Sequence, residues 1–407
     1  MSATSETQPS AEQLARTFSL YNEEHMQDPH RIWDTLRARC PVAHSDELDG
    51  FWMLTKYEDV RAALLDHRVF SNKEVMVPRN RLGDDLGERP PITLDPPKHT
   101  AFRQLLLPGF APAQVRKLEP ALRETCRNAI AEIAGDTCDV ADDYAKKIPP
   151  ELICTMMGVS VDIAPQFAQW AKELNEAPDI QDAFAAGAAL AQWMAGEVAE
   201  HAGKPGDDLI TLLARSEFDG QRLSPEELIG SLVLIMLGGM DTAWSVISSM
   251  LWHLAQHPGD RRRLAGDPSL IPTAIEEFLR FYAPLNLARI TTTSTAVNGV
   301  EIGEDESVLM CYGSANRDAE AFDRPDEVVI DRYPNKHMAF GLGPHRCIGS
   351  NIARLELKVA LEEWLAAFPE FSLADPEAVH WTLGQVWGPQ TVPITLHRGS
   401  SEGNARG

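Results

Sequence analysis

The sequence predicts a mainly α-helical fold with small β-sheets. Apolar residues recur at helical spacing through most of the first two thirds of the chain and again after Ser350. Alternating strand patterns are confined to three short regions, at Gly50–Thr55, Ala288–Tyr312 and Gly384–Leu396. A third observation is the apolar segment Pro225–Gln256, which predicts one helix of about 48 Å, at about 1.5 Å per residue, that crosses the core.

The composition is that of a large acidic protein. The chain has 407 residues, 44% of them hydrophobic, which suffices for a sizeable core. With 60 acidic against 37 basic residues the net charge is −23, which argues against nucleic acid as a partner. Six cysteines without C-x-x-C spacing indicate neither a zinc site nor a disulfide framework. The richest apolar run, Leu232–Leu237, is too short to span a bilayer and no signal peptide is recognised, so we expect a cytoplasmic protein without a membrane partner.

The N-terminal region contains short elements. Residues 1–20 begin with a Ser-, Thr- and Glu-rich stretch, and we expect this segment to be disordered. A helix is predicted at Pro29–Cys40, and the strand Gly50–Thr55 is followed by a predicted helix at Tyr57–Asp66.

The segment Phe70–Pro97 is an irregular loop with five prolines and two glycines. A loop of this length in a compact protein is usually functional or disordered. Its apolar members Val75, Met76 and Val77 are therefore candidates for lining a pocket.

His99 and Arg103 lie four residues apart at the start of the helix that follows Pro97. Residues at this spacing project from one face of a helix. Taken alone, the pair is best explained as part of an exposed polar face.

Further helices are predicted between residues 112 and 201. They span Pro112–Ile133, Val140–Met157, Ile163–Leu174 and Gln181–His201. Because proline removes a helical hydrogen bond, we expect Pro120 to break the first helix and Pro149-Pro150 to break the second.

The long helix has a clear start. Ser224 supplies an N-cap, Pro225 occupies the first position, and Glu227 completes a capping box. The helix should end before His257-Pro258-Gly259.

The middle of that helix reads Gly238-Gly239-Met240-Asp241-Thr242. Two helical glycines cost about 1 kcal/mol each relative to alanine, and a buried Asp costs more unless it is satisfied. One explanation is a close helix crossing at the glycines, with Thr242 bonded back to the preceding turn. The explanation that we favour is a locally opened helix over an oxygen site, where Thr242 holds water or dioxygen and Asp241 relays protons.

Glu277 and Arg280 lie three residues apart in a predicted helix, Pro272–Tyr282. Such a pair contributes a few tenths of a kcal/mol on a helix surface, so E-x-x-R alone is a weak signal. After Pro284 the period changes to that of strands, with a turn signal at Asn298-Gly299.

The segment Phe340–Gly349 sets one cysteine in a glycine-punctuated loop before a predicted helix, about Ser350 to Phe368. Gly341 and Gly343 permit a tight turn. The positive end of the following helix is expected to lower the pKa of the Cys347 thiol. A buried structural cysteine is the alternative, but the full spacing F-G-x-G-x-H-x-C-x-G is improbable by chance, and we interpret the cysteine as an iron ligand.

This spacing resembles the haem-binding loop of the cytochrome P450 family of haem-thiolate monooxygenases. Four more signatures fall in the family's order: H-x-x-x-R at His99 and Arg103, G-G-x-D-T at residues 238–242, E-x-x-R at residues 277–280, and a strand arginine, Arg289. The branch stays open between camphor- and cineole-type hydroxylases and a branch often fused to its reductase. The cineole type has Asn where this chain has Thr242, so its substrate-assisted oxygen activation is not carried over.

The resemblance implies a single, mainly helical catalytic domain at residues 21–398, with residues 1–20 and a flexible tail at 399–407 outside it. Haem b (iron protoporphyrin IX) would lie between the long helix and the last helix, with Cys347 as the proximal ligand. The other residues implied to contact haem are His99, Arg103, Gly238, Arg289, Phe340 and His345. Asp241 and Thr242 are the implied catalytic pair, and Arg332 would join Glu277 and Arg280 in a structural contact.

The implied reaction inserts one oxygen atom of O2 into a substrate, with electrons from a redox partner. Only 60 residues follow Cys347, so we expect a separate ferredoxin or flavodoxin with its reductase. Two alternatives stay open: a peroxide-driven haem-thiolate enzyme, which would not need Asp241 and Thr242, and a non-catalytic haem sensor or carrier.

Positions that match the family's pocket walls are apolar. They are Val75, Val77, Leu234, Leu237, Gly238, Leu285, Leu287 and Val386. Asn286 and Gln385 would be polar exceptions if they faced inward. Because no basic residue is present to hold a carboxylate, we expect a compact hydrophobic substrate with one oxygen. A monoterpenoid is our first choice and a small aromatic ether the second.

A basic patch is expected near the cysteine loop for the electron donor. The cations assigned to it are Lys98, Arg103, Lys336, Arg346 and Arg354. We expect those not engaged by haem propionates to steer an acidic ferredoxin.

Overall fold

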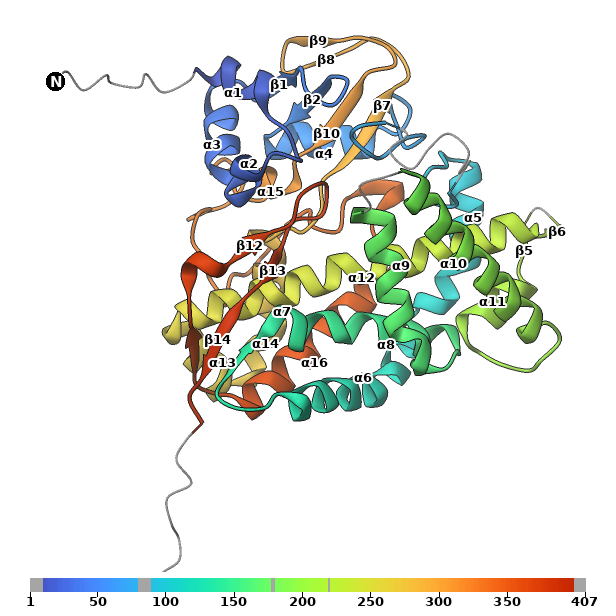
Figure 1. Ribbon diagram of the computed structural model, residues 1–407. Helices are drawn as coiled ribbons and strands as arrows, with labels where there is room; N and C mark the ends of the chain where they lie inside the picture. The colour runs from blue at the N-terminus through green and yellow to red at the C-terminus, as the bar shows by residue number, and fades with distance from the viewer. Residues whose placement is uncertain (1–9, 80–88, 177–179, 219, 399–407) are drawn as a thin grey trace, which may run out of the picture.

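The computed structural model describes residues 10–79, 89–176, 180–218 and 220–398. Helices form most of it, most strands lie at the top and left of the view, and one two-stranded pair lies at the right (Figure 1). The chain therefore has the mainly helical fold with small sheets that its sequence predicts.

Helix α12 (Pro225–Gln256) runs through the middle of the helical part (Figure 1). It packs against α8 (Ile148–Met157), α10 (Ile180–His201) and α16 (Ser350–Ala367). The other helices are α1 (Ala11–Thr17), α2 (Glu23–Gln27), α3 (Pro29–Arg39), α4 (Tyr57–Leu65), α5 (Lys98–Leu106), α6 (Pro112–Glu132), α7 (Val140–Asp143), α9 (Ala164–Glu176), α11 (Leu209–Arg215), α13 (Pro258–Gly266), α14 (Ile271–Phe281) and α15 (Tyr312–Ala315).

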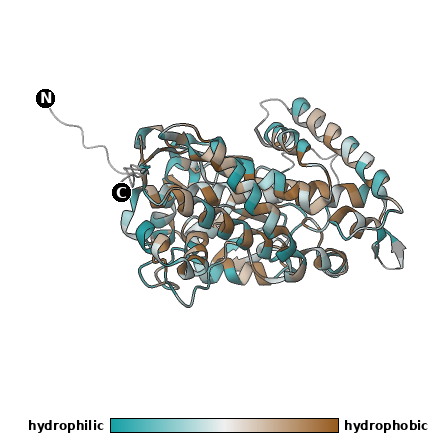
Figure 2. Cartoon of the chain, turned by 90° about the horizontal axis from the view of Figure 1, so that it is seen from below, coloured by the Kyte–Doolittle hydropathy of each residue, from teal (hydrophilic) through white to brown (hydrophobic). Residues whose placement is uncertain are grey.

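The ends and the burial of α12 follow from its sequence. The Ser224 hydroxyl accepts a hydrogen bond from the Glu227 N–H and the Glu227 carboxylate accepts one from the Ser224 N–H, which is the predicted capping box. By length and composition α12 could cross a membrane, but residues 243–251 are all buried inside the protein. Figure 2 shows hydrophobic and hydrophilic stretches alternating along the helices, as expected of helices that bury one face.

The largest sheet has the strand order β1-β2-β10-β7-β3, with β10 parallel to β2 and its other pairs antiparallel. Its strands are β1 (Val42–Ser45), β2 (Phe51–Leu54), β3 (Phe70–Ser71), β7 (Leu287–Thr291) and β10 (Ser307–Met310). A second sheet has the order β11-β14-β4, from β4 (Thr137–Asp139), β11 (Phe371–Leu373) and β14 (Pro393–Leu396). Three two-stranded pairs are β5 (Glu217–Phe218) with β6 (Gln221–Arg222), β8 (Thr295–Val297) with β9 (Val300–Ile302), and β12 (His380–Trp381) with β13 (Pro389–Thr391).

Residues 10–20 belong to the fold, contrary to our expectation of disorder for residues 1–20. Ser10 caps α1 in a capping box with Gln13. Phe18 and Leu20 are fully buried, and burying two large apolar side chains stabilises the segment by a few kcal/mol. Residues 1–9 and the tail 399–407 lie outside the described residues.

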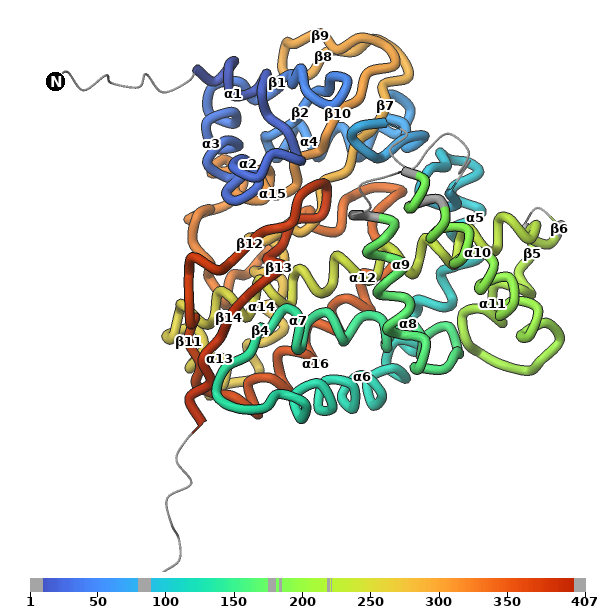
Figure 3. The backbone as a smooth tube through the Cα atoms, viewed as in Figure 1, coloured from blue at the N-terminus to red at the C-terminus, as the bar shows by residue number. Residues whose placement is uncertain are grey.

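Pro120 does not interrupt α6, contrary to our expectation. Helix α6 packs along α16 (Figure 3), and Arg123 of α6 bonds to Glu362 and Glu363 of α16 at 2.6 and 2.7 Å. This packing offsets the roughly 3 kcal/mol that an internal proline costs. Pro149 does mark a break, because the helical pattern at 140–157 divides into α7 and α8 with this residue in the first turn of α8.

Candidate active site

The loop before α16 closes a hydrogen-bonded turn around Cys347. The Cys347 N–H donates to the Phe340 carbonyl at 2.8 Å. Gly341 and Gly343 have φ angles of +64° and +69°, and a Cβ atom on Gly343 would lie 2.7 Å from the Leu64 carbonyl oxygen. Glycine is therefore required at both positions, and the turn holds Cys347 just before the N-terminus of α16.

The Cys347 side chain is exposed, whereas Cys126, Cys154 and Cys311 are buried. Desolvation by the surrounding protein nevertheless raises the pKa of the Cys347 thiol, against the hydrogen bond from the Gly349 N–H and nearby arginines. The pKa is thus raised and not lowered as predicted, because desolvation outweighs the Gly349 hydrogen bond and the arginines. A metal ion that binds the sulfur displaces its proton, so the thiol remains suited to ligation.

His99 and Arg103 of α5, Arg289 of β7 and His345 of the cysteine loop converge next to Cys347. The rings of His99 and His345 lie 3.9 Å apart between centroids. Burial, followed by the effects of His99, Arg289 and Arg103, lowers the pKa of His345 to about 2. Burial and Arg103 lower the pKa of His99 to about 4. Both rings are therefore neutral near pH 7, and the positive charge of the cluster is that of Arg103 and Arg289.

Two buried ring nitrogens of this cluster, His99 Nδ1 and His345 Nε2, have no hydrogen-bond partner in the described protein. An unpaired buried polar atom costs about 1–3 kcal/mol, and Arg289 beside them is only 4% exposed. Carboxylates bound here would supply acceptors and neutralise the positive charge. The propionates of haem are such carboxylates, and Cys347 offers a thiolate for its iron. The residues present therefore fit a haem group.

The middle of α12 presents a stripe of accessible residues at helical spacing. Leu234, Leu237, Asp241 and Thr242 are half-buried and Gly238 is exposed. Met236, Met240 and Ala243 are buried, whereas Val233, Ile235 and Gly239 beside the stripe are half-buried as well. Positions i, i+3, i+4, i+7 and i+8 share one face of a helix. Five of the predicted pocket and catalytic residues thus lie on one face of α12. This face is apolar at its N-terminal end and polar at its C-terminal end.

Helix α12 is continuous through this stripe, so the expected local opening is not present. The Thr242 hydroxyl donates to the Gly238 carbonyl at 2.9 Å, one turn earlier. A Cβ atom on Gly239 would lie 3.3 Å from Ile153 Cδ1 of α8, whereas one on Gly238 would have no neighbour within 4 Å among the residues that the structure describes. The close crossing and the back-bonded threonine of the alternative explanation both occur, at Gly239 and at Thr242.

Asp241 faces an indole from the next turn of the same helix. The Trp244 Nε1–H donates to Asp241 Oδ1 at 3.1 Å. The Ser245 hydroxyl donates to the Asp241 carbonyl at 2.6 Å. The sequence analysis did not single out Trp244, although a tryptophan three residues after an acid is a readable signal for such a bond.

Among the predicted wall residues, Leu285 and Val386 lie opposite each other in an isolated β-bridge, and both are half-buried, as is Leu287. Val75 and Val77 are only 2% and 1% exposed. They are packed against protein and cannot line a pocket, so their assignment was wrong.

The position of the Val75 segment follows from its hydrogen bonds. The Val75 carbonyl accepts from the Ala288 N–H at 2.9 Å and from Gln385 Nε2 at 2.8 Å. This pairing turns Val75 and Val77 into the core and leaves Met76, between them, half-buried. Gln385 is itself buried by these bonds and Asn286 is fully buried, so neither polar residue lies open to a pocket.

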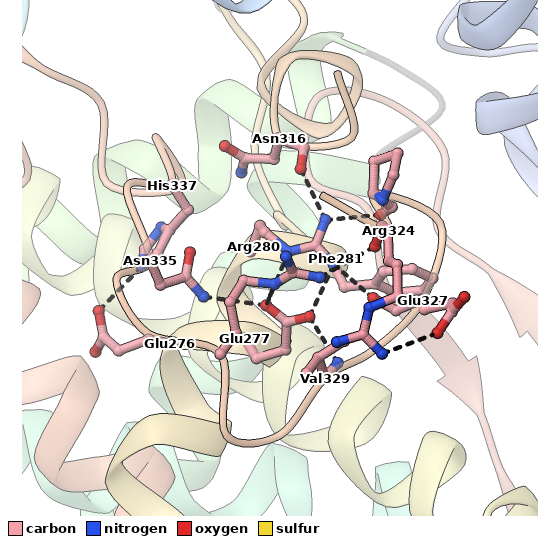
Figure 4. Close-up of polar contacts among 12 residues, drawn as sticks. Glu276, Glu277, Arg280, Phe281, Asn316, Arg324, Glu327, Val329, Asn335 and His337 are labelled. Atoms are coloured by element: carbon pink, nitrogen blue, oxygen red, sulfur yellow. Dashed lines mark hydrogen bonds and ion pairs between the residues drawn. The ribbon is translucent and has the colours of Figure 1, made fainter. Parts of the chain in front are cut away.

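Glu277 and Arg280 form a fully buried ion pair at the end of α14 (Figure 4). Arg280 donates to both carboxylate oxygens at 2.8 Å, and Arg332 donates to Glu277 Oε2 at 2.9 Å. Arg280 also bonds to the carbonyls of Pro325 and Glu327. The structure therefore brings together the three residues predicted to form a structural contact, and they hold the segment before the cysteine loop.

Sequence reasoning missed a second contact, between Glu276 and Arg354 of α16. Arg354 donates to both Glu276 oxygens at 2.6 and 2.7 Å, and its guanidinium lies 4.6 Å from the Phe340 ring centroid. Burial alone raises the pKa of Glu276, but the bonds from Arg354 and His337 bring it to about 2. The pair is separated by 78 residues, so no local pattern could reveal it.

A family model described as Cytochrome P450 matches residues 269–383. The chain is 34% identical to the vitamin D(3) 25-hydroxylase of Pseudonocardia autotrophica, over 93% of this chain and 96% of that protein. It is 31% identical to the mycinamicin IV hydroxylase/epoxidase of Micromonospora griseorubida, over 84% and 89%. Its structure superposes on the bacillaene polyketide synthase cytochrome P450 PksS of Bacillus subtilis with a TM-score of 0.87 and 28% identity, over 94% and 100%.

Proposed function

This chain belongs to the cytochrome P450 family of haem-dependent monooxygenases, and we propose that it hydroxylates a compact hydrophobic molecule. The observation that carries the proposal is the accessible stripe of α12. Its apolar end, at Leu234 and Leu237, suits a hydrophobic substrate, and its polar end, at Asp241 and Thr242, suits proton delivery. A haem carrier or sensor does not need a surface that combines an apolar substrate site with groups for proton delivery.

Haem b, the cofactor of this family, supplies when bound the iron at which dioxygen is activated for insertion into a substrate bond. Cys347 would ligate the iron through its thiolate, with the Gly349 N–H bonded to the sulfur. His99, Arg103, Arg289 and His345 would bind the propionates, because the unpaired His99 and His345 nitrogens need partners.

Asp241 and Thr242 are proposed to move and hold protons at the polar end of the stripe. The Thr242 hydroxyl donates a hydrogen bond to the Gly238 carbonyl, so its oxygen is left to accept a hydrogen bond from a water beside Asp241. Asp241 would exchange protons with that water, and general acid–base help of this kind is worth about 10²–10⁴-fold in rate.

The proposed substrate is a monoterpenoid or a similar small alicyclic compound, with a small aromatic ether as the second choice. The wall residues that remain are apolar: Leu234, Leu237, Leu285, Leu287 and Val386. The two polar residues beside them, Asn286 and Gln385, are buried in the protein. Apolar walls without a basic residue favour a neutral hydrophobic molecule over a fatty acid.

A larger substrate is a second candidate, favoured by the relatives. The similar proteins are named for vitamin D(3) 25-hydroxylation and for mycinamicin IV hydroxylation or epoxidation. A secosteroid or a macrolide would need more room than a monoterpenoid, between α12 and the helices α9 and α10 that lie over it (Figure 1).

A binding screen over monoterpenoids, aromatic ethers, secosteroids, macrolides and fatty acids, read by the spin-state shift of the haem absorption, tests the substrate. We expect tight binding by a monoterpenoid. Spin-shifting binding by a secosteroid or a macrolide alone would replace the first candidate with the second, and binding by a fatty acid alone would overturn both.

Turnover tests the chemistry separately. With the ligand found in the screen, we expect product with dioxygen and an electron source, and little with peroxide alone. Thr242→Ala should divert reducing equivalents to hydrogen peroxide, and Asp241→Asn should slow turnover. Unchanged coupling in Thr242→Ala would remove this hydroxyl from the proposal.

The electron donor is proposed to be a separate ferredoxin or flavodoxin that docks beside the cysteine loop, in a cytoplasmic setting. Arg354 is engaged by Glu276 and Arg103 bonds to the Arg346 carbonyl, so the expected patch is smaller than the sequence suggested. Arg346 and Lys336 are exposed. On a chain with a net charge of −23, these cations favour an acidic partner at this face.

A further inference from the structure

We propose that Trp244 is a positioning residue for Asp241: its indole N–H orients the carboxylate that delivers protons. This inference rests on the proposed role of Asp241. Trp244 follows Asp241 by three residues on α12, so both project from one face. The Nε1–H donates to Asp241 Oδ1 at 3.1 Å.

The indole is itself held in place by its surroundings. Trp244 is 9% exposed and belongs to the hydrophobic core. The Lys146 ammonium lies 5.1 Å from the centroid of the Trp244 ring. A cation over an aromatic face is attracted by the ring, and it draws electron density from the ring, which makes the N–H a better donor.

Lys146 is in turn anchored by two other parts of the fold. Its ammonium donates to Asp142 of α7 at 2.5 Å and to the Gln390 carbonyl of β13 at 3.0 Å. A chain of contacts thus runs from β13 and α7 through Lys146 and Trp244 to Asp241. Lys146 is fixed by bonds outside α12 and contacts the Trp244 ring, so the position of the indole, and through it that of the carboxylate, depends on the rest of the fold as well as on α12.

The alternative is that Trp244 only fills space and uses Asp241 to satisfy its buried N–H. The two accounts differ in what removal of the N–H alone does. If the bond orients the carboxylate, its loss changes proton delivery, and if the bond only satisfies the indole, its loss changes stability.

The first measurement is spectroscopic and does not depend on activity. In holoprotein labelled with ¹⁵N-tryptophan, in the ferrous carbon monoxide form, the indole N–H signal of Trp244 is the one that disappears in Trp244→Phe. We expect this signal to move upfield in Asp241→Asn. The signal of Trp252, two turns later on α12 and identified by Trp252→Phe, should not move. An unmoved Trp244 signal would show that the two side chains do not bond, and would overturn the inference.

The second measurement isolates the N–H in turnover. Replacing Trp244 by 3-benzothienylalanine keeps the size and the aromatic face and removes the donor, and Trp244→Phe is the simpler companion. We expect both to lower the fraction of reducing equivalents that reach product, to raise the solvent isotope effect, and to slow turnover roughly three- to tenfold, against 10²-fold or more for Asp241→Asn. Substrate affinity should be unchanged, and Trp252→Phe should behave as wild type.

The outcomes separate the two hypotheses. If Asp241→Asn slows turnover but benzothienylalanine at position 244 leaves coupling and the isotope effect unchanged, Trp244 is structural and only this inference fails. If Asp241→Asn itself leaves turnover unchanged, the proposed role of Asp241 fails and the positioning role fails with it.

Discussion

Replacing Glu277 by glutamine should destabilise the protein far more than the same change one residue earlier. The Glu277 carboxylate accepts five hydrogen bonds. They come from Arg280 Nε, Arg280 Nη2, Arg332 Nε, Asn335 Nδ2 and the Val329 N–H, at 2.7–3.0 Å. Both partners of the ion pair are 0% exposed, so water cannot replace a lost bond.

The magnitude follows from the geometry of these bonds. Glutamine has the same shape, but its NH2 group must stand where either Oε1 or Oε2 of Glu277 stood, facing two donors or three. At least two charge-assisted or buried hydrogen bonds are lost, at about 1.5 kcal/mol or more each, and Arg280 keeps an uncompensated buried charge. We therefore expect a loss of about 3–5 kcal/mol, a large part of a typical total of about 5–15 kcal/mol.

The assay is urea unfolding of the holoprotein at 25 °C, followed by far-ultraviolet circular dichroism and by haem absorption. Glu276→Gln is the matched control, because Glu276 and Arg354 are 26% and 32% exposed, so water replaces part of the bonding that is lost and we expect a smaller loss of about 1–2 kcal/mol. We expect Glu277→Gln also to bind less haem, since the segment before the cysteine loop is held by this cluster. Equal losses in the two variants, or a loss below about 1 kcal/mol for Glu277→Gln, would refute the reasoning.

Three other predictions follow from the structure. Cys347→Ser should shift the Soret band of the ferrous carbon monoxide adduct, because a hydroxyl does not provide the thiolate ligand; an unshifted band would exclude Cys347 as the ligand. Arg346→Glu should weaken reduction by an acidic ferredoxin, most strongly at low salt, and a rate indifferent to both mutation and ionic strength would contradict the docking proposal. Glu356→Gln should reduce the loss of stability as pH rises, because burial raises the pKa of Glu356 to about 8; urea unfolding at pH 5 and pH 8 measures it.

The sign of the Glu356 effect follows from proton linkage. Glu356 is 3% exposed and its Oε1 atom has no hydrogen-bond partner in the described protein. Because the folded state holds this proton more tightly than the unfolded state does, stability falls as pH rises from the unfolded pKa, about 4.3, to about 8. The slope approaches about 1.4 kcal/mol per pH unit inside that window. Equal pH dependence in wild type and Glu356→Gln would contradict it.

The sequence by itself determined the features that depend on nearby residues. Helical periodicity and the capping box of Ser224 and Glu227 located α12, because both depend on residues within one or two turns. The glycine spacing of the cysteine loop predicted a turn that the positive φ angles of Gly341 and Gly343 bear out. The strands predicted at Gly50–Thr55 and from Ala288 onward are found at Phe51–Leu54 and Leu287–Thr291, because alternation and turn residues are local signals.

Only the tertiary structure decided what depends on burial and on contacts between distant segments. Pro120 lies inside a continuous helix because α16 packs along that helix. Residues 10–20 are ordered because Phe18 and Leu20 are buried in the hydrophobic core. Val75 and Val77 turn inward because their segment pairs with β7. The pKa of Cys347 is raised because desolvation, which the sequence does not display, outweighs the Gly349 hydrogen bond and the nearby arginines. Local patterns fix the backbone of an element, whereas the solvent exposure of each side chain is set by what packs against it.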